Sequence, residues 1–320
     1  MKTGLYKHAV IVCLFFSNLV VFAQQKIDSN TVKKSYWEVS ANYLSNAVYS
    51  GRKDSAIVAY LRPSIGYHHK SGVYIKAGLA YLSSAGSDNK INMFSIDGGY
   101  DFSIGEHLDA GLYASQYFYS DASYAVLSEL NGSAGFYAGY NLGAVNINAG
   151  ADFLFSQSTD FTGNLGLNHE FNWTKKKTIW SLYPAVVLNA GTQYFYESYY
   201  KYRKFVVANG NGNSKGRGHS QTTTANNGYS SSVSSLTVSY NNRFTVLDYE
   251  LSLPFKYEQK KWSFYITPTY AMPVSPISYN TGQTIETESL SNSFFVEIGA
   301  TLKLLKHLYH VTGVANPYHK

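Results

Sequence analysis

Three consecutive segments between Leu130 and Phe171 alternate apolar and polar residues with a period of two. In the middle segment the odd-numbered residues from Val145 to Phe155 are apolar, and the even-numbered ones include Asn146 and Asp152. A period of two indicates β-strands, because successive side chains of a strand point to opposite faces. Segments of about ten such residues, joined by tight polar turns, are typical of membrane-spanning β-barrels. The pattern therefore predicts apolar side chains facing lipid and polar side chains facing a lumen.

The composition of the chain favours the same class of protein. Charged residues make up only 14% of the sequence and aromatic residues 16%, with 30 tyrosines and 26 glycines. A soluble domain carries about 25% charged residues, and aromatic residues collect in girdles at membrane interfaces. The mean hydropathy is nevertheless −0.20, and beyond the N-terminus no apolar run approaches the roughly 20 residues of a membrane-spanning helix. Insertion into a membrane would have to be by strands.

The N-terminus has the features of a secretory signal peptide. Lys2 and Lys7 precede an apolar stretch at 9–22, and Ala23 ends a cleavage-site pattern. Cys13, the only cysteine, lies within this segment, so the mature chain would contain no disulfide and no thiol. Removing the two lysines lowers the formal charge from +6 to +4, an excess too small to predict nucleic-acid binding. The expected organisation is a signal peptide at 1–23, a lead at 24–35, a barrel at 36–305 and a tail at 306–320.

The alternating pattern continues on both sides of the central segments and predicts about twelve strands. Pro184 interrupts the ninth and predicts a local irregularity there. Short connections are expected at 68–72, 103–107, 141–144, 173–178 and 258–261, and mostly longer ones at 46–55, 84–90, 120–125, 156–160, 198–231 and 273–291. This sorting by end is typical of outer-membrane barrels, in which short turns are periplasmic and long loops extracellular. The predicted fold is all-β, a transmembrane up-and-down antiparallel β-barrel.

The polar parity of the expected strands identifies candidate lumen-lining residues. Its acidic members are Glu38, Asp97, Asp101, Asp109, Glu129, Asp152, Glu170, Asp248, Glu250 and Glu297, and its basic members are Arg62, Lys76, Lys256 and Lys303. Ten acids against four bases favour a pore for cations or small polar solutes, because rings of carboxylates attract cations. Alternatively, the same side chains form salt bridges and hydrogen bonds that fill a narrow, closed barrel. The pattern gives the face of each residue but not the reach of its side chain, so both alternatives stay open.

The segment at 198–231 is rich in glycine, asparagine, serine and threonine and shows no sustained period. A connection of this length in a compact domain is usually functional or disordered. Its basic residues are Lys201, Arg203, Lys204, Lys215 and Arg217. They would contact anionic lipopolysaccharide or fold into the barrel mouth, or the segment is simply a solvated extracellular loop.

Hydrolase chemistry and metal binding find little support in the sequence. A serine nucleophile needs a histidine base within hydrogen-bonding reach. His169, the only histidine at the centre of an expected strand, falls on the lipid-facing parity, and the neighbouring strands offer no outward serine beside it. His68, His69 and the histidines of the tail lack the ordered spacing of a metal site. We therefore expect a structural His169, no enzyme activity and no cofactor.

The segment from Ser45 to Ser83 combines a Tyr/Arg-Gly turn with a hairpin turn that reads His-x-Ser-Gly followed by an aromatic residue. The residues that carry this pattern are Tyr49, Gly51, Arg52, Tyr67, His68, Ser71, Gly72 and Tyr74. With them the chain resembles the first strands of a family of small porins among Gram-negative outer-membrane β-barrel proteins. The resemblance implies a pore. Barrels of this class often end on an aromatic residue that is used in assembly, whereas this chain continues past Leu305.

The function expected from these observations is that of a porin-like channel in the outer membrane for small polar or cationic solutes. The alternative is a closed structural or docking barrel that presents the 198–231 loop to a partner or to lipopolysaccharide. Outer-membrane lipid, lipopolysaccharide and the barrel-assembly machinery are the expected partners, with a small polar solute for the pore.

Overall fold

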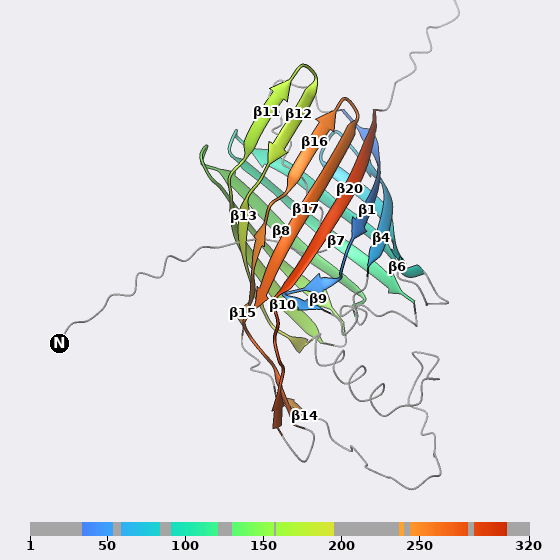
Figure 1. Cartoon of the computed structure of the whole chain (residues 1–320). Helices are drawn as coiled ribbons and strands as arrows, with labels where there is room; N and C mark the ends of the chain where they lie inside the picture. The colour runs from blue at the N-terminus through green and yellow to red at the C-terminus, as the bar shows by residue number, and fades with distance from the viewer. Residues whose placement is uncertain are drawn as a thin grey trace, which may run out of the picture.

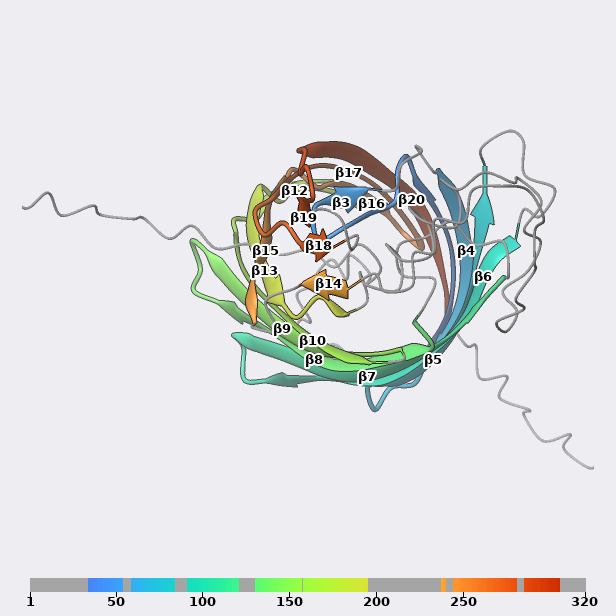
Figure 2. The same ribbon diagram turned by 90° about the horizontal axis from the view of Figure 1, so that it is seen from below.

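A computed structural model describes residues 34–53, 59–83, 91–120, 130–156, 158–194, 237–239, 244–280 and 285–305. These residues form a closed antiparallel barrel of twelve strands, whose ring is seen end-on in Figure 2. In chain order the strands are β1 (Tyr36–Leu44), β4 (Tyr60–His68), β5 (Val73–Leu82), β6 (Ile91–Ile104), β7 (Leu108–Tyr119), β8 (Gly132–Asn141), β9 (Asn146–Phe155), β10 (Thr159–Asn168) continued by β11 (Phe171–Lys175), β12 (Thr178–Leu182) continued by β13 (Ala185–Gly191), β15 (Thr245–Ser252) continued by β16 (Phe255–Gln259), β17 (Trp262–Pro273) and β20 (Ser293–Leu305). Pairing of β20 with both β1 and β17 closes the ring.

The outer surface of the barrel is apolar, as the alternating pattern predicts. In β1, for example, Trp37, Val39 and Tyr43 are 40–46% exposed, whereas Glu38 and Ser40 between them point inward. Other outward side chains that are more than half exposed include Val73, Ile75, Ile104, Leu112, Phe118, Trp173 and Phe294. Side chains of this kind on one continuous outer face are stabilised by lipid and not by water. The twelve expected strands and the direction of their two faces are confirmed.

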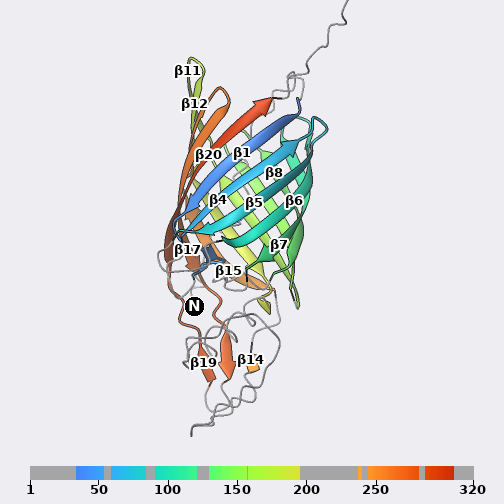
Figure 3. The same ribbon diagram turned by 90° about the vertical axis from the view of Figure 1, so that its right-hand side faces the viewer.

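No described helix is long and apolar enough to cross a membrane. The strands are tilted in the ring, as Figure 3 shows for β1, β4, β5 and β6.

Three neighbouring strands of the ring break at the same level. The backbone N–H of Tyr183 donates to the carbonyl of Pro254 (2.9 Å), and that of Leu253 donates to the carbonyl of Pro268 (3.1 Å). On the other side of this line, the N–H of His169 reaches the carbonyl of Pro184 (3.2 Å). Proline has no backbone N–H to donate to the neighbouring strand, so the ladder of backbone hydrogen bonds stops at Pro184 and Pro254. The irregularity predicted at Pro184 is confirmed, and the breaks beside it were not predicted.

Tyrosines cover glycines on the inner face of the barrel. Tyr74 lies directly across from Gly99 in the neighbouring strand, and Tyr265 lies across from Gly299. A Cβ atom on Gly99 would come within 2.5 Å of the Tyr74 hydroxyl oxygen. The pairs Tyr137 with Gly111 and Tyr113 with Gly135 repeat this arrangement in β7 and β8. An aromatic ring laid over a cross-strand glycine shields its backbone and pins the register.

These pairs correct the interpretation of the tyrosine content, which the sequence attributed to membrane girdles. Some tyrosines do face outward, including Tyr43, Tyr100, Tyr140 and Tyr270. The girdle candidate at 117–119 is divided between the faces, because Phe118 is exposed outside while Tyr117 donates to or accepts from Ser133 inside. A large share of the aromatic content therefore belongs to the barrel interior.

Replacing Gly99 by alanine tests the importance of this packing. The new methyl group would meet the backbone carbonyl of Leu112 at 2.5 Å as well as the Tyr74 ring. Overpacking of this kind costs about 1–3 kcal/mol, and we expect a corresponding loss in the free energy of unfolding measured by urea titration in lipid. The adjacent Gly98→Ala is the control, because the atom nearest to its added methyl group is the Tyr74 carbonyl oxygen at 3.7 Å. Equal losses in both variants would show that the tyrosine contact is unimportant.

Several long-loop predictions are corrected by the structure. The predicted loop at 46–55 contains a hairpin of β2 (Val48–Tyr49) and β3 (Arg52–Lys53), in which the side chains of Val48, Tyr49 and Arg52 are buried. The predicted loop at 156–160 is shorter, because β10 begins at Thr159. Beyond the barrel, β14 (Thr237–Ser239), β18 (Ser278–Asn280) and β19 (Ile285–Thr287) form a small sheet below the ring in Figure 1. Residues 1–33, 195–236 and 306–320, with the signal peptide, long loop and tail, lie outside the described residues.

Candidate functional site

The structure places thirteen of the fourteen candidate lumen residues on the inner face of the barrel wall. Glu129 lies outside the described residues. The others are Glu38, Arg62, Lys76, Asp97, Asp101, Asp109, Asp152, Glu170, Asp248, Glu250, Lys256, Glu297 and Lys303. Their common face follows from strand parity, since the position of each differs by an even number from that of an inward residue in the same strand. Glu170 lies between β10 and β11 and continues the parity of Asn164 in β10.

Polar contacts on the inner face of the barrel run along the wall. Arg62 of β4 pairs with Glu297 of β20 at 3.0 Å across β1, and Tyr265 of the neighbouring β17 donates to Glu297 at 2.7 Å. Tyr137 of β8 likewise donates to Asp101 of β6 at 2.6 Å. Each of these contacts joins strands that are adjacent or one apart in the ring. They hold charged groups against the wall.

Further contacts along the wall also involve inward acids. Ser115 donates to Asp97 (2.6 Å) from the neighbouring strand. Ser103 donates to Asp109 (2.6 Å) in the same way. Lys256 and Glu258, two residues apart on β16, form an ion pair of 2.9 Å. Glu170 accepts hydrogen bonds from Asn172 (2.7 Å) and Tyr183 (3.0 Å).

A second group of acids lies on β9, β10 and β15 toward the long-loop end. We call Asp152, Asp160, Asp248 and Glu250 the acidic arc; each has at most 2% of its surface exposed. Asn189 of β13 donates to Asp248 (2.8 Å), and Thr192 donates to Asp160 (2.6 Å). The sequence missed Asp160, because it lay within the loop predicted at 156–160. Its even parity with Thr162 and Asn164 was the available signal.

The β2–β3 hairpin crosses the mouth of the barrel at the long-loop end. Val48 belongs to a buried apolar cluster with Leu44, Tyr60 and Phe295, which come from β1, β4 and β20. Tyr49, next in the chain, lies in the electrostatic field of Asp152 and Asp160, on β9 and β10. Strands β4 and β10 are six places apart in a ring of twelve, which makes them opposite walls. Figure 2 shows β3 inside the ring.

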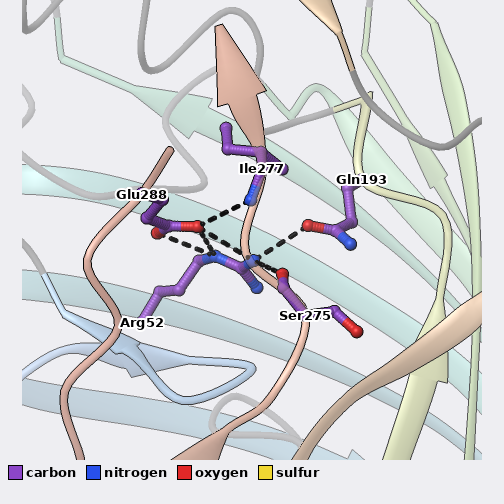
Figure 4. Close-up of polar contacts among 5 residues, drawn as sticks. All are labelled: Arg52, Gln193, Ser275, Ile277 and Glu288. Carbon is purple, nitrogen blue, oxygen red and sulfur yellow. Dashed lines mark hydrogen bonds and ion pairs between the residues drawn. The ribbon is translucent and has the colours of Figure 1, made fainter. Parts of the chain in front are cut away.

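Arg52 connects this hairpin to the segments that follow the barrel strands β13 and β17 and to the residue that follows β19 (Figure 4). Its Nε donates to Glu288 at 3.1 Å, and its Nη2 donates to the side-chain oxygen of Gln193 at 2.9 Å. The same Nη2 donates to the carbonyl of Ser275, and Glu288 also accepts from the backbone N–H of Ile277 at 3.3 Å. The side chains of Arg52 and Glu288 are only 2% and 7% exposed. We call these five residues the Arg52 node.

The ionisable groups at the mouth of the barrel act on one another electrostatically. Arg52 lies close enough to Asp248 to act on it electrostatically. Burial raises the pKa of the Tyr49 hydroxyl well above its usual range, and the charges of Asp152 and Asp160 raise it further. Tyr49 therefore stays neutral at physiological pH and adds no negative charge to the acidic arc. The sequence highlighted Arg52 only as part of a turn, and nothing local to it indicates a partner 236 residues away.

The described residues contain no group of three or more His, Cys, Asp or Glu side chains arranged to hold a metal ion. His169 contacts the carbonyl of Ala144 through Nδ1, and its ring lies edge-on to Phe171 with centroids 4.2 Å apart. Among the hydrogen bonds of the described residues, none joins the His169 ring to a serine or threonine hydroxyl. This position agrees with the expected structural role.

A closed ring of strands with an apolar outer face and a polar, charged inner face decides the class of fold. The chain is a transmembrane β-barrel of the outer-membrane type.

Comparison with known proteins finds similarity among solved structures alone. No family model and no curated protein sequence matches the chain. Among solved structures, the KdgM porin is similar with 9% identity and a TM-score of 0.42, over 83% of this chain and 98% of that one. The NanC porin has 10% identity and a TM-score of 0.41, over 84% and 100%. LpxR from Salmonella typhimurium has 9% identity and a TM-score of 0.41, over 83% and 99%.

Proposed function

We propose that this barrel is a porin-like channel of the outer membrane that passes small polar and cationic solutes, with short turns in the periplasm and long loops outside. The observation that carries the proposal is the placement of charge on the barrel wall. Contacts such as Arg62 with Glu297 and Tyr137 with Asp101 join nearby strands, so they hold charged groups beside the lumen. A closed barrel would instead need such groups to interlock across its centre.

The excess of acids supports a preference for cations. The thirteen expected residues supply nine inward acids and four bases. Asp160 and Glu258 raise the acids to eleven, and the Arg52–Glu288 ion pair adds one charge of each sign. Carboxylates arranged around a narrow path attract cations by their field. A solute that enters past the β2–β3 hairpin would then meet the acidic arc first as it reaches the lumen.

The proposal is tested by swelling of liposomes that contain the refolded mature chain, residues 24–320. We expect faster swelling in an isosmotic solution of arginine than in one of aspartate, and slow swelling in a trisaccharide. The variant Asp97→Asn with Asp101→Asn removes two wall charges at nearly constant volume and should reduce the preference for arginine. Equal rates for arginine and aspartate in the unmodified protein would contradict cation preference, and no swelling would contradict passage.

A closed docking barrel is the second candidate, and the buried β2–β3 hairpin favours it. The Arg52 node ties this hairpin across the mouth with an ion pair that is almost completely buried. In such a barrel the long loop at 198–231 would contact a partner or lipopolysaccharide, as the sequence predicts. An enzyme is the least favoured reading, because His169 contacts a backbone carbonyl and an aromatic ring.

A further inference from the structure

Five lysines gather at two adjacent turns of the short-turn end. Lys175, Lys176 and Lys177 form the tip of the β11–β12 hairpin, and Lys260 and Lys261 form the tip of the β16–β17 hairpin. Strands β12 and β16 pair with Thr178 opposite Gln259, which places the two tips side by side. Figure 1 shows these hairpins next to one another at the top of the barrel. We call the five residues the lysine rim.

The lysine rim stands directly beyond a cluster of outward aromatic residues. Trp173, Trp180 and Trp262 are 38–52% exposed and lie within the last residues of the same hairpins. Trp180 packs edge-on against Tyr257 with ring centroids 4.4 Å apart. Tryptophan prefers the level of the lipid headgroups, where its ring is half apolar and half hydrated. The lysines of the rim follow or precede these tryptophans by a few residues, at the tips of the hairpins. They therefore lie at the level of the lipid headgroups or just beyond it.

The charges of the lysine rim are not neutralised by the protein. All five side chains are exposed. The acids nearest in sequence are engaged elsewhere, because Glu258 pairs with Lys256 and Glu170 accepts from Asn172 and Tyr183. Among the described residues, no ion pair involves a lysine of the rim. A concentrated positive charge thus faces outward.

The backbone at both tips is one that lysine rarely adopts. Lys176 has a φ of 58° and Lys260 a φ of 57°. This left-handed region is favourable for glycine and tolerated by asparagine, and it is unfavourable for a long side chain. Both adjacent turns thus place a lysine at a left-handed position where glycine or asparagine is usual. A strained position that persists is a pointer to function at that position.

We propose that the lysine rim binds the anionic headgroups of phospholipids in the membrane leaflet at the short-turn end of the barrel. Charge complementarity identifies the lipid, and the tryptophans beneath the rim set the depth at which its phosphate lies. Exposed lysines near a membrane surface attract anionic lipid. This binding site is on the outside of the barrel and does not depend on whether the lumen conducts.

Three of the four tryptophans, all except Trp37 of β1, lie beside the rim, so quenching of tryptophan fluorescence by brominated lipid reports mainly the lipids next to it. The refolded mature chain would be placed in phosphatidylcholine vesicles that contain a minor fraction of phosphatidylglycerol, with bromine on one lipid or the other. We expect the anionic lipid to be enriched about fivefold near the protein relative to its bulk fraction, and the enrichment to fall as salt is raised. Quenching that follows the bulk composition would overturn the proposal, and would leave a soluble acidic partner as the occupant of the rim.

Two paired variants separate charge from folding. Lys176→Asn with Lys260→Asn removes two charges and places a residue suited to φ near 60° at both tips, so the hairpins should fold at least as well. Lys176→Arg with Lys260→Arg keeps both the charge and the strain. We expect the asparagine variant to lose enrichment and the arginine variant to retain it. Unchanged enrichment in the asparagine variant would also overturn the proposal, and heat-modifiable migration on a gel checks folding of each protein.

Discussion

Replacing Arg52 by alanine is expected to free the β2–β3 hairpin from the barrel mouth and to raise the conductance of the channel. The substitution removes the guanidinium donors of the Arg52 node and leaves the carboxylate of Glu288 buried without its cation. Removing one partner of a buried ion pair costs about 3–5 kcal/mol. That cost falls on the hairpin and the segments around Gln193 and Ser275, because the barrel strands keep their own ladders.

The effect is measured as single-channel current in planar bilayers, with proteolysis at the hairpin as an independent readout. Glu288→Gln should act in the same direction but less strongly, since a neutral amide keeps an acceptor for Arg52. Arg62→Ala is the matched control, because it removes a lumen base whose ion-pair partner, Glu297, lies on β20 of the wall and not in the hairpin. Unchanged current and unchanged proteolysis in Arg52→Ala would show that the hairpin does not restrict the path.

Replacing Leu112 by arginine is expected to prevent stable insertion of the barrel. Leu112 is 55% exposed on the outer face, in the middle of β7, with Tyr100 and Phe136 as its cross-strand neighbours. An arginine on the lipid face costs about 2–4 kcal/mol at the bilayer midplane and about 0–1 kcal/mol near the interface. We expect a loss at the upper end of this range, seen as a lower urea midpoint for unfolding from vesicles.

Leu108→Arg provides the control at a different depth. Leu108 lies on the same face at the first residue of β7, where the strand leaves the short turn at 105–107. Its cost should be close to the interfacial value, because the arginine side chain reaches the headgroups. Similar losses at Leu112 and Leu108 would contradict a membrane around the middle of the barrel.

The strand pattern was sufficient to predict the barrel wall. Alternation decides the face of each residue independently of its partners, so Trp37 and Leu112 were assigned outward and Glu38 and Asp97 inward from local sequence alone. The strand break at Pro184 could also be predicted, because proline lacks the N–H that the ladder requires.

The contents of the mouth could not be predicted in the same way. The segment at 45–53 has no sustained period, and the buried apolar residues that cluster with Val48 come from five strands, β1, β4, β5, β17 and β20, which meet only in the closed ring. The partner of Arg52, Glu288, is 236 residues further along the chain. The tyrosine and glycine pairs depend on register, which sequence alone leaves open. Distant partners and register are set by closure of the barrel, and residue type alone does not identify them.

The measurement that tests the proposed channel most directly is single-channel recording of the refolded mature chain, residues 24–320, under a salt gradient. The acid excess on the inner wall predicts discrete current steps with a reversal potential on the cation-selective side. A bilayer that stays silent, although the same preparation shows heat-modifiable migration and therefore a folded barrel, would contradict an open path. Steps that are anion-selective would contradict the role assigned to the inward carboxylates.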